Sequence, residues 1–168
     1  MKGVVSLETA KYSALDIARF VINYSNRSNS PITNLKLQKL LYFIQAYFIT
    51  KLNRPCFKDD IEAWSLGPVV PSVYHEFKNY GAGYIPYIKA YFDMSHGSSS
   101  FMHVFNPDNI SRSDQECIQT IVDNLSKYSA STLVTITHDQ EPWKKAFEYG
   151  YKVIPLLSIK NYFEKLSE

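Results

Sequence analysis

The stretch LKLQKLLYFIQAYF, residues 35–48, carries the most regular hydrophobic pattern of this 168-residue chain. Its apolar side chains recur at spacings of three and four residues, which places them on one face of an α-helix. Thr33 or Asn34 can cap the start of this helix, and the pattern ends near Leu52. Because the segment is among the most hydrophobic of the chain, we predict that it is the central helix of the core. The residues of the stripe are Leu37, Leu40, Leu41, Ile44 and Phe48.

Shorter helical patterns lie on both sides of this segment. The clearest one covers residues 13–28, where Ser13 can cap the helix and Asp16 lies near the positive end of its dipole. Gly67 and Pro68 form a predicted turn, and Pro68 suits the first position of the next helix. The further predicted helices are residues 68–80, a helix opened by a capping box at Ser113 and Glu116, residues 131–138, residues 139–147, and a last helix capped by Ser158.

Two short segments have the character of strands. Ile61–Trp64 is too short for a helix, and Met102–Phe105 lies within a long connection, residues 82–112, that has no helical period. We predict that these two segments pair. The sequence therefore predicts a mainly α fold, a single compact helical domain of about six helices with a small two-stranded β element. Residues 1–12 form a lead-in, and residues 13–168 form the domain.

Composition excludes several classes of protein. The 18 Lys and Arg against 16 Asp and Glu leave a net charge of +2, too small for a general polyanion binder. Cys56 and Cys117 have no metal-type spacing, and two free thiols fit a reducing cytoplasm. The most apolar stretch is half the length of a membrane span. No spacing of the four histidines or of the glycines indicates a metal, nucleophile or phosphate site, so we expect no cofactor and no enzyme activity.

Positive charge is concentrated in the first third of the chain. Residues 17–58 contain seven basic residues and no acidic one. Such a stretch can dock an acidic protein or contact phosphates, or it can simply be a solvated face balanced by the acidic remainder. A helix-turn-helix is disfavoured, because residues 28–32 are long for its turn and the second helix is too hydrophobic to read base edges. The basic residues are Arg19, Arg27, Lys36, Lys39, Lys51, Arg54 and Lys58.

Three segments together resemble a known family. They are LKLQKLLYF at 35–43, preceded by Asp16-Ile17-Ala18, then EAWSLGPVVPSVY at 62–74, and THDQEPW at 137–143. In this order they resemble the Panacea domain of SocA-like antitoxins, which includes phage-associated proteins of the GepA type, from about residue 13 to the C-terminus. Leu66 departs from the aromatic residue that many members carry before Gly-Pro-Val.

The resemblance implies a small, non-enzymatic bacterial or prophage protein that neutralises a toxin encoded beside it. It implies neutralisation either by direct contact or by delivery of the toxin to a protease, with toxins that vary among members of the family. We expect a cytoplasmic monomer or weak dimer. The alternatives are a nucleic-acid-binding or transcriptional regulatory phage protein and, with less support, a hydrolase built around His138 and Glu141.

The residues of the motifs allow two interpretations. Each has a structural role available, such as a turn at Pro68, a helix end at His138 and an apolar face on Trp143. Alternatively they line one concave surface, since tryptophan and tyrosine are the types that anchor protein partners. The predicted partner-binding residues are Lys36, Lys39, Trp64, Pro68, Tyr74, His138 and Trp143.

Overall fold

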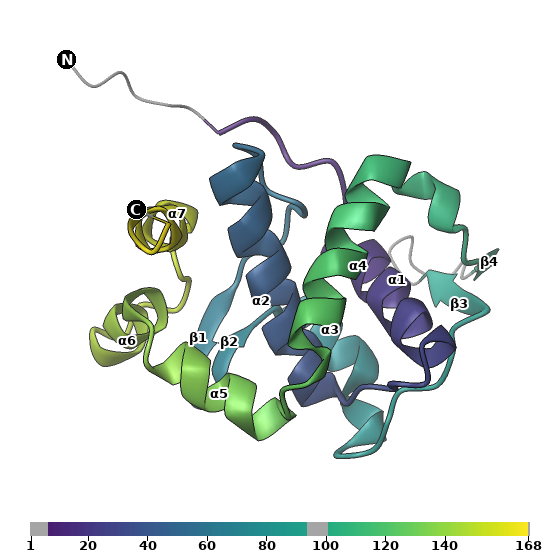
Figure 1. Cartoon of the computed structure of the whole chain (residues 1–168). Helices are drawn as coiled ribbons and strands as arrows, with labels where there is room; N and C mark the ends of the chain where they lie inside the picture. The colour runs from purple at the N-terminus through teal and green to yellow at the C-terminus, as the bar shows by residue number, and fades with distance from the viewer. Residues whose placement is uncertain (1–6, 94–100, 168) are drawn as a thin grey trace.

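The computed structural model describes residues 7–93 and 101–167, and Figure 1 shows a helical bundle built around one central helix. Part of the predicted lead-in and the glycine and serines at 97–100 lie outside the described residues. The helices are α1 (Ala14–Arg27), α2 (Asn34–Lys51), α3 (Pro71–Phe77), α4 (Arg112–Ser126), α5 (Ala130–His138), α6 (Glu141–Glu148) and α7 (Leu156–Lys165), with short 3-10 helices at Lys78–Tyr80 and Pro107–Asn109. The prediction of a mainly α fold is confirmed.

Helix α2 is the centre of the core, as its pattern predicts. It contacts α1, α3, α4, α5 and α7, and it also contacts a short strand, β2 (Gly67–Val69). The predicted stripe is fully buried, and so is Tyr42 on another side of the same helix. A helix that is buried around most of its circumference needs neighbours on every side, which explains why α1, α3, α4, α5 and α7 are arranged around it (Figure 1).

The two β elements differ from the predicted one. Strand β1 (Glu62–Trp64) pairs antiparallel with β2, only two residues further along the chain, and not with the segment near Met102. That segment forms β4 (Phe101–Val104) and pairs with β3 (Ala90–Asp93). The prediction of one pair was wrong because glycine at 67 and proline at 68 suggested a turn. An edge strand nevertheless tolerates proline, since its outer edge needs no N–H donor.

Several helix starts also shift from the predicted residue. Ser13 and Thr33 cap α1 and α2 as predicted, each accepting a hydrogen bond from the backbone N–H three residues later. Pro71, and not Pro68, is the proline in the first turn of α3. In the C-terminal third, the cap positions of α4 and α7 are Ser111 and Pro155, two and three residues before the predicted Ser113 and Ser158. Helix α5 begins at Ala130, one residue earlier than predicted, and α6 begins at Glu141, two residues later than predicted.

Within the described part of the chain, no helix combines the length and the apolar character that crossing a membrane requires.

Candidate partner-binding site

The first two sequence motifs meet along one face of α2. There, polar side chains of α2 form hydrogen bonds with main-chain groups of the second motif. Gln38 accepts a hydrogen bond from the Val70 N–H at 2.8 Å and donates to the Asn34 side-chain oxygen at 2.9 Å. Asn34 in turn donates to the Tyr74 carbonyl at 3.1 Å. These three hydrogen bonds form one connected network. Through it, α2 fixes both the residue that follows β2 and the first turn of α3.

Lys39 lies one residue further along α2 and is fully buried. Its ammonium donates to the Pro68 carbonyl at 2.9 Å. Burial lowers the pKa of Lys39 to about 7, since a charged amine loses its hydration there. Gly67 covers this amine with a backbone φ of +100°, and a Cβ at this position would lie 2.9 Å from both Lys39 Cε and Thr137 Oγ1. Glycine is therefore required both by the conformation and by the space.

The third motif closes the same assembly from the side of α5 and α6. The buried Tyr42 hydroxyl donates to the Gln140 side-chain oxygen at 2.8 Å. The Trp143 indole N–H donates to the Trp64 carbonyl at 2.9 Å, and the His138 ring stacks on Trp143 with centroids 4.0 Å apart. Burial and, after it, the nearby Lys39 lower the pKa of His138. The three motifs are thus one interlocked unit.

A groove opens on the outer side of this unit. Trp64 packs edge-on against Tyr74 with ring centroids 4.9 Å apart, and Leu66, at the tip of the β1–β2 hairpin, is 56% exposed beside them. The hollow between the start of α2, the hairpin and α3 has a volume of about 420 Å³. Its walls are mostly apolar, as in sites that bind protein partners. It is lined by Asn34, Leu35, Gln38, Trp64, Ser65, Leu66, Val69, Tyr74, Lys78, Gly81 and Ala82.

The structure separates the predicted partner-binding residues into three groups. Trp64 and Tyr74 line the groove. Lys39, Pro68 and Trp143 are buried and hold the groove walls from behind.

His138 and Lys36 complete the set of predicted residues. His138 is half-buried and stacks on Trp143 behind the groove. Lys36 lies elsewhere, because its ammonium donates to the Ser126 carbonyl at the end of α4 at 2.9 Å. Leu66, which sequence reasoning treated only as a departure from the motif, is an exposed member of the groove.

The basic stretch does not form one exposed patch. Three of its seven charged side chains, those of Arg19, Lys39 and Arg54, are buried. Of the others, Arg27 lies over the Tyr87 ring and Lys36 is held at α4. Nonspecific phosphate binding depends on several exposed cations acting together, so this arrangement favours an internal role for much of the positive charge.

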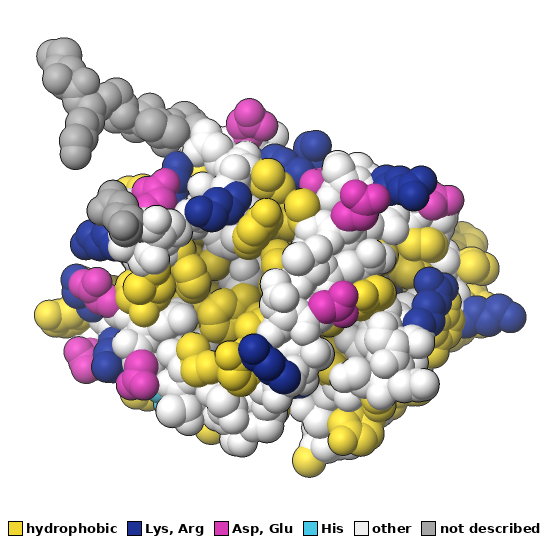
Figure 2. Space-filling view, viewed as in Figure 1, with side chains coloured by type: hydrophobic (Ala, Val, Ile, Leu, Met, Phe, Trp, Pro, Cys, Tyr) yellow, Lys and Arg dark blue, Asp and Glu magenta, His cyan; other side chains and the backbone are white. Residues whose placement is uncertain are grey.

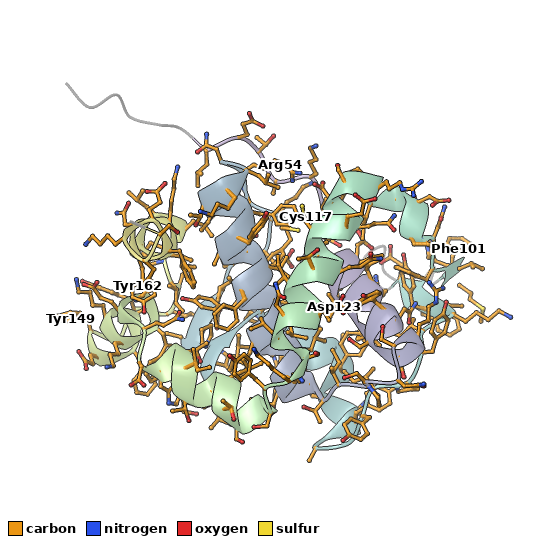
Figure 3. The ribbon with its side chains drawn as sticks, in the orientation of Figure 1. Arg54, Phe101, Cys117, Asp123, Tyr149 and Tyr162 are labelled. Atoms are coloured by element: carbon orange, nitrogen blue, oxygen red, sulfur yellow. The ribbon has the colours of Figure 1, made fainter. Side chains whose placement is uncertain are left out.

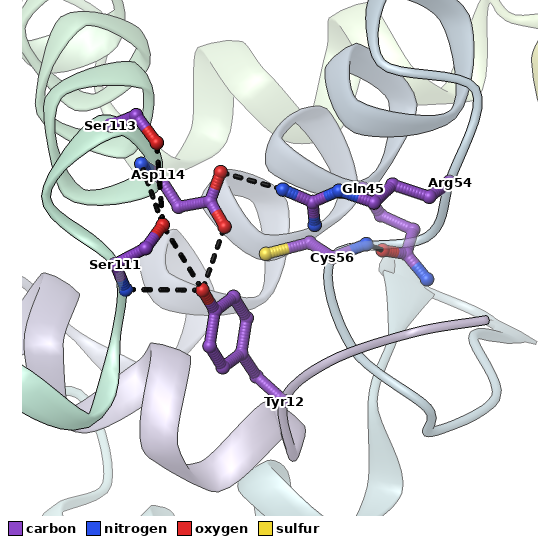
Figure 4. Close-up of polar contacts among 7 residues, drawn as sticks. All are labelled: Tyr12, Gln45, Arg54, Cys56, Ser111, Ser113 and Asp114. Atoms are coloured by element: carbon purple, nitrogen blue, oxygen red, sulfur yellow. Dashed lines mark hydrogen bonds and ion pairs between the residues drawn. The ribbon is translucent and has the colours of Figure 1, made fainter. Parts of the chain in front are cut away.

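A second polar cluster, which the sequence did not indicate, ties the segment before α1 to α4 (Figure 4). Arg54 forms a buried ion pair with Asp114 at 2.6 Å, and the Tyr12 hydroxyl donates to the same carboxylate at 2.7 Å. Burial alone would raise the pKa of Asp114, but the hydrogen bonds from Tyr12, Arg54 and Ser111 outweigh it and lower that pKa. Burial raises the pKa of the neighbouring Cys56 thiol well above its ordinary value, which disfavours a reactive thiolate.

The face shown in Figure 2 has an apolar hollow of its own, between α2, α4 and α7. It is smaller, about 230 Å³, and is lined among others by Phe43, Tyr47, Leu125 and Phe163. None of the predicted partner-binding residues lines it. Among the residues that the structure describes, no group of three or more His, Cys, Asp or Glu side chains is placed to hold a metal ion.

The sequence that builds this small helical domain matches a known protein family. The family model for the antitoxin SocA-like Panacea domain matches residues 37–144, which include all three motifs except the first two residues of the first. The chain belongs to this family.

The antitoxin SocA of Caulobacter vibrioides (strain NA1000 / CB15N) is 33% identical to this chain over 143 residues. The matched region covers 84% of this chain and 67% of that protein. No solved structure matches the chain. The resemblance predicted from the three motifs is therefore confirmed at the level of the family.

Proposed function

We propose that this protein is an antitoxin that neutralises a toxin protein by direct binding, and that its groove beside the β1–β2 hairpin receives the toxin. The observation that carries the proposal is the position of Trp64, Leu66 and Tyr74. These side chains lie within the region that matches the family model, yet they line an open apolar groove instead of filling the core.

The geometry of the groove suits binding better than catalysis. Lys78 is the one Asp, Glu, His, Lys or Arg side chain among the residues that line it, whereas Lys39 and His138 lie behind its wall and Lys39 is fully buried. Trp64 is held in place at both polar ends, because its indole N–H donates to Glu62 at 2.8 Å and its carbonyl accepts from Trp143. A rigid aromatic anchor loses little conformational entropy on binding, which favours affinity.

The test uses Leu66, because its exposed side chain can be changed without disturbing packing. The toxin is taken to be the product of the neighbouring reading frame, once that frame alone has been shown to stop growth. The wild-type protein should restore growth on co-expression, and Leu66→Glu should lose at least tenfold in rescue, since a carboxylate cannot be desolvated against an apolar partner. The matched control is Leu157→Glu, an exposed leucine of α7 with 61% exposure, which should rescue like the wild type.

The amount of toxin distinguishes the two routes to neutralisation. Blockade leaves the toxin level unchanged during rescue, whereas delivery to a protease lowers it, and an immunoblot measures the difference. The proposal fails if the neighbouring frame remains equally lethal with the wild-type protein present. The assignment of the groove as the toxin-binding site is refuted if Leu66→Glu and Leu157→Glu rescue growth equally.

A further inference from the structure

The β3–β4 hairpin is the most exposed apolar element among the described residues. All four residues of β4 are exposed, and Phe101, Met102 and Val104 are between 65% and 73% exposed. Figure 3 places Phe101 at the far end of the molecule from α6 and α7. Natural proteins usually protect such an edge strand with lysine, proline or a covering segment. Strand β4 contains no lysine or proline, and among residues 7–93 and 101–167 no further strand covers its edge.

The root and one face of the hairpin are firmly held by the rest of the protein, whereas Phe92, Met102 and Val104 on its other face are exposed in the described structure. Buried Asn23 of α1 donates to the Ile88 carbonyl at 2.8 Å and accepts from the Ile88 N–H at 2.7 Å. The Arg19 guanidinium lies 3.5 Å from the centroid of the Tyr91 ring, and Tyr91 stacks on His103. Within the described chain no further strand pairs with the edge of β4.

We propose that β4 pairs antiparallel with β4 of a second copy of this chain, forming a four-stranded sheet across a two-fold axis. A two-stranded hairpin is marginally stable by itself, and additional strands with an apolar face stabilise it. The hairpin supplies both requirements, an unpaired edge and an apolar face.

Symmetry and side-chain alternation select the register. A two-fold axis perpendicular to the sheet requires paired residues to face the same side, and an axis at His103 pairs the largest number of described residues. Met102 then lies opposite Val104 of the second copy, on the same face as Phe92. The apolar residues of the two copies join into one continuous row across the sheet.

Charge favours the second copy as the occupant and the antiparallel direction. Residues 101–105 carry no Lys, Arg, Asp or Glu, so pairing the strand with itself brings no like charges together. Asp93 lies beside Phe101 at one end of the hairpin, and Lys89 lies beside Phe105 at the other. Antiparallel pairing places Asp93 of each copy at the end where Lys89 of the other lies. At three strand spacings, about 14 Å, this attraction is weak, but a parallel pairing would align like charges.

Sedimentation equilibrium of the full chain at about pH 8, where an ordinary imidazole is neutral, tests the proposal. A contact this small should dissociate with a Kd between about 10 µM and about 1 mM. Met102→Lys should weaken the dimer at least tenfold, because it places an ammonium in the apolar row. The control is Leu166→Lys, which has the same 65% exposure at the end of α7 and should leave the Kd unchanged. Backbone amide shifts that depend on concentration should be confined to the hairpin.

A wild-type protein that stays monomeric to about 1 mM overturns the proposal. So does a dimer that Met102→Lys and Leu166→Lys weaken equally, since the hairpin is then not the contact. If Met102→Lys lowers the melting temperature, Val104→Lys, at 73% exposure, replaces it in the same comparison. Toxin rescue is measured separately, so this result and that of the proposed function are independent.

Discussion

Lys39 should make the stability of the protein rise with pH near neutrality. Its amine is fully buried, with the Pro68 carbonyl as the hydrogen-bond acceptor, and its pKa falls from the ordinary 10.5 to about 7. The unfolded chain therefore binds a proton that the folded chain releases, and the free energy of unfolding increases with pH between these two values. The difference of about 3.5 units sets an upper limit of about 5 kcal/mol on the cost of burying the ammonium.

In the interval from about pH 7.0 to about pH 8.5, Lys39 makes the largest contribution, and Lys36, whose pKa is also lowered by burial, adds to it with the same sign. Below this interval, His138 contributes with the same sign, because its pKa is lowered too. Above it, buried Cys56 contributes with the opposite sign, because its pKa is raised. Across the interval, the proton bound by Lys39 in the unfolded chain predicts a gain of about 1.5 kcal/mol in the free energy of unfolding.

Urea unfolding followed by circular dichroism measures this gain at the two pH values. The wild-type midpoint should move to higher urea at the higher pH, and Lys39→Met should remove most of that movement. Lys58→Met, which removes an exposed lysine from the loop after α2, should retain it. If Lys39→Met shows the same pH dependence as the wild type, Lys39 is not the buried titrating amine and the reasoning is refuted.

Urea unfolding also tests three further substitutions, one each in the interlocked unit, in the Arg54–Asp114 cluster and at the cap of α1. Gly67→Ala should lower the free energy of unfolding by about 2–4 kcal/mol, because of its positive φ and the close contact of a Cβ with Lys39. Gly150→Ala, with a φ of +69° but no atom near the new Cβ, should lower it by about 1 kcal/mol. Equal losses of stability in the two variants would contradict the crowding at Gly67. Asp114→Asn should cost about 3–5 kcal/mol by leaving Arg54 unpaired. Since the pKa of Asp114 is lowered, the wild type should also lose stability as the pH falls below about 4, and Asp114→Asn should lose less. Ser13→Ala should cost about 1 kcal/mol, and no change would show that the cap of α1 is unimportant.

The sequence predicted α2 and its burial because a helical period extends over several turns, and the caps at Ser13 and Thr33 because their chemistry is local. It did not predict β2, since a three-residue strand has no period and its Gly-Pro pair is also typical of a turn. What makes Gly67–Val69 a strand is its pairing with β1 and the lysine amine beneath it. These contacts form only in the folded protein, so the local sequence does not reveal them.

Two of the seven residues predicted to bind a partner line the groove, and the layout of the others could not be predicted. Trp64 and Tyr74 line the groove. The residue type alone does not show whether a side chain faces the groove or the core, so the prediction of partner-binding residues also included the buried Lys39 and Trp143. Likewise the charge of Arg54 suggested a surface role, whereas its partner Asp114 is 60 residues away in the chain and left no local signal. Long-range pairs of this kind become visible only once the chain is folded.

Both margins of the β1–β2 hairpin are already occupied. On the β1 side, the Ala63 N–H donates to the Lys152 carbonyl and the Ile154 N–H donates to the Ile61 carbonyl. On the β2 side, the Lys39 ammonium donates to the Pro68 carbonyl, and the Gln38 side-chain oxygen accepts from the N–H of Val70, the residue after β2. Because these main-chain groups are already hydrogen-bonded within the protein, a bound polypeptide cannot use them to add a strand to the β1–β2 hairpin. Selectivity at this place can change by replacing a few outward residues such as Leu66, while the scaffold that presents them stays the same.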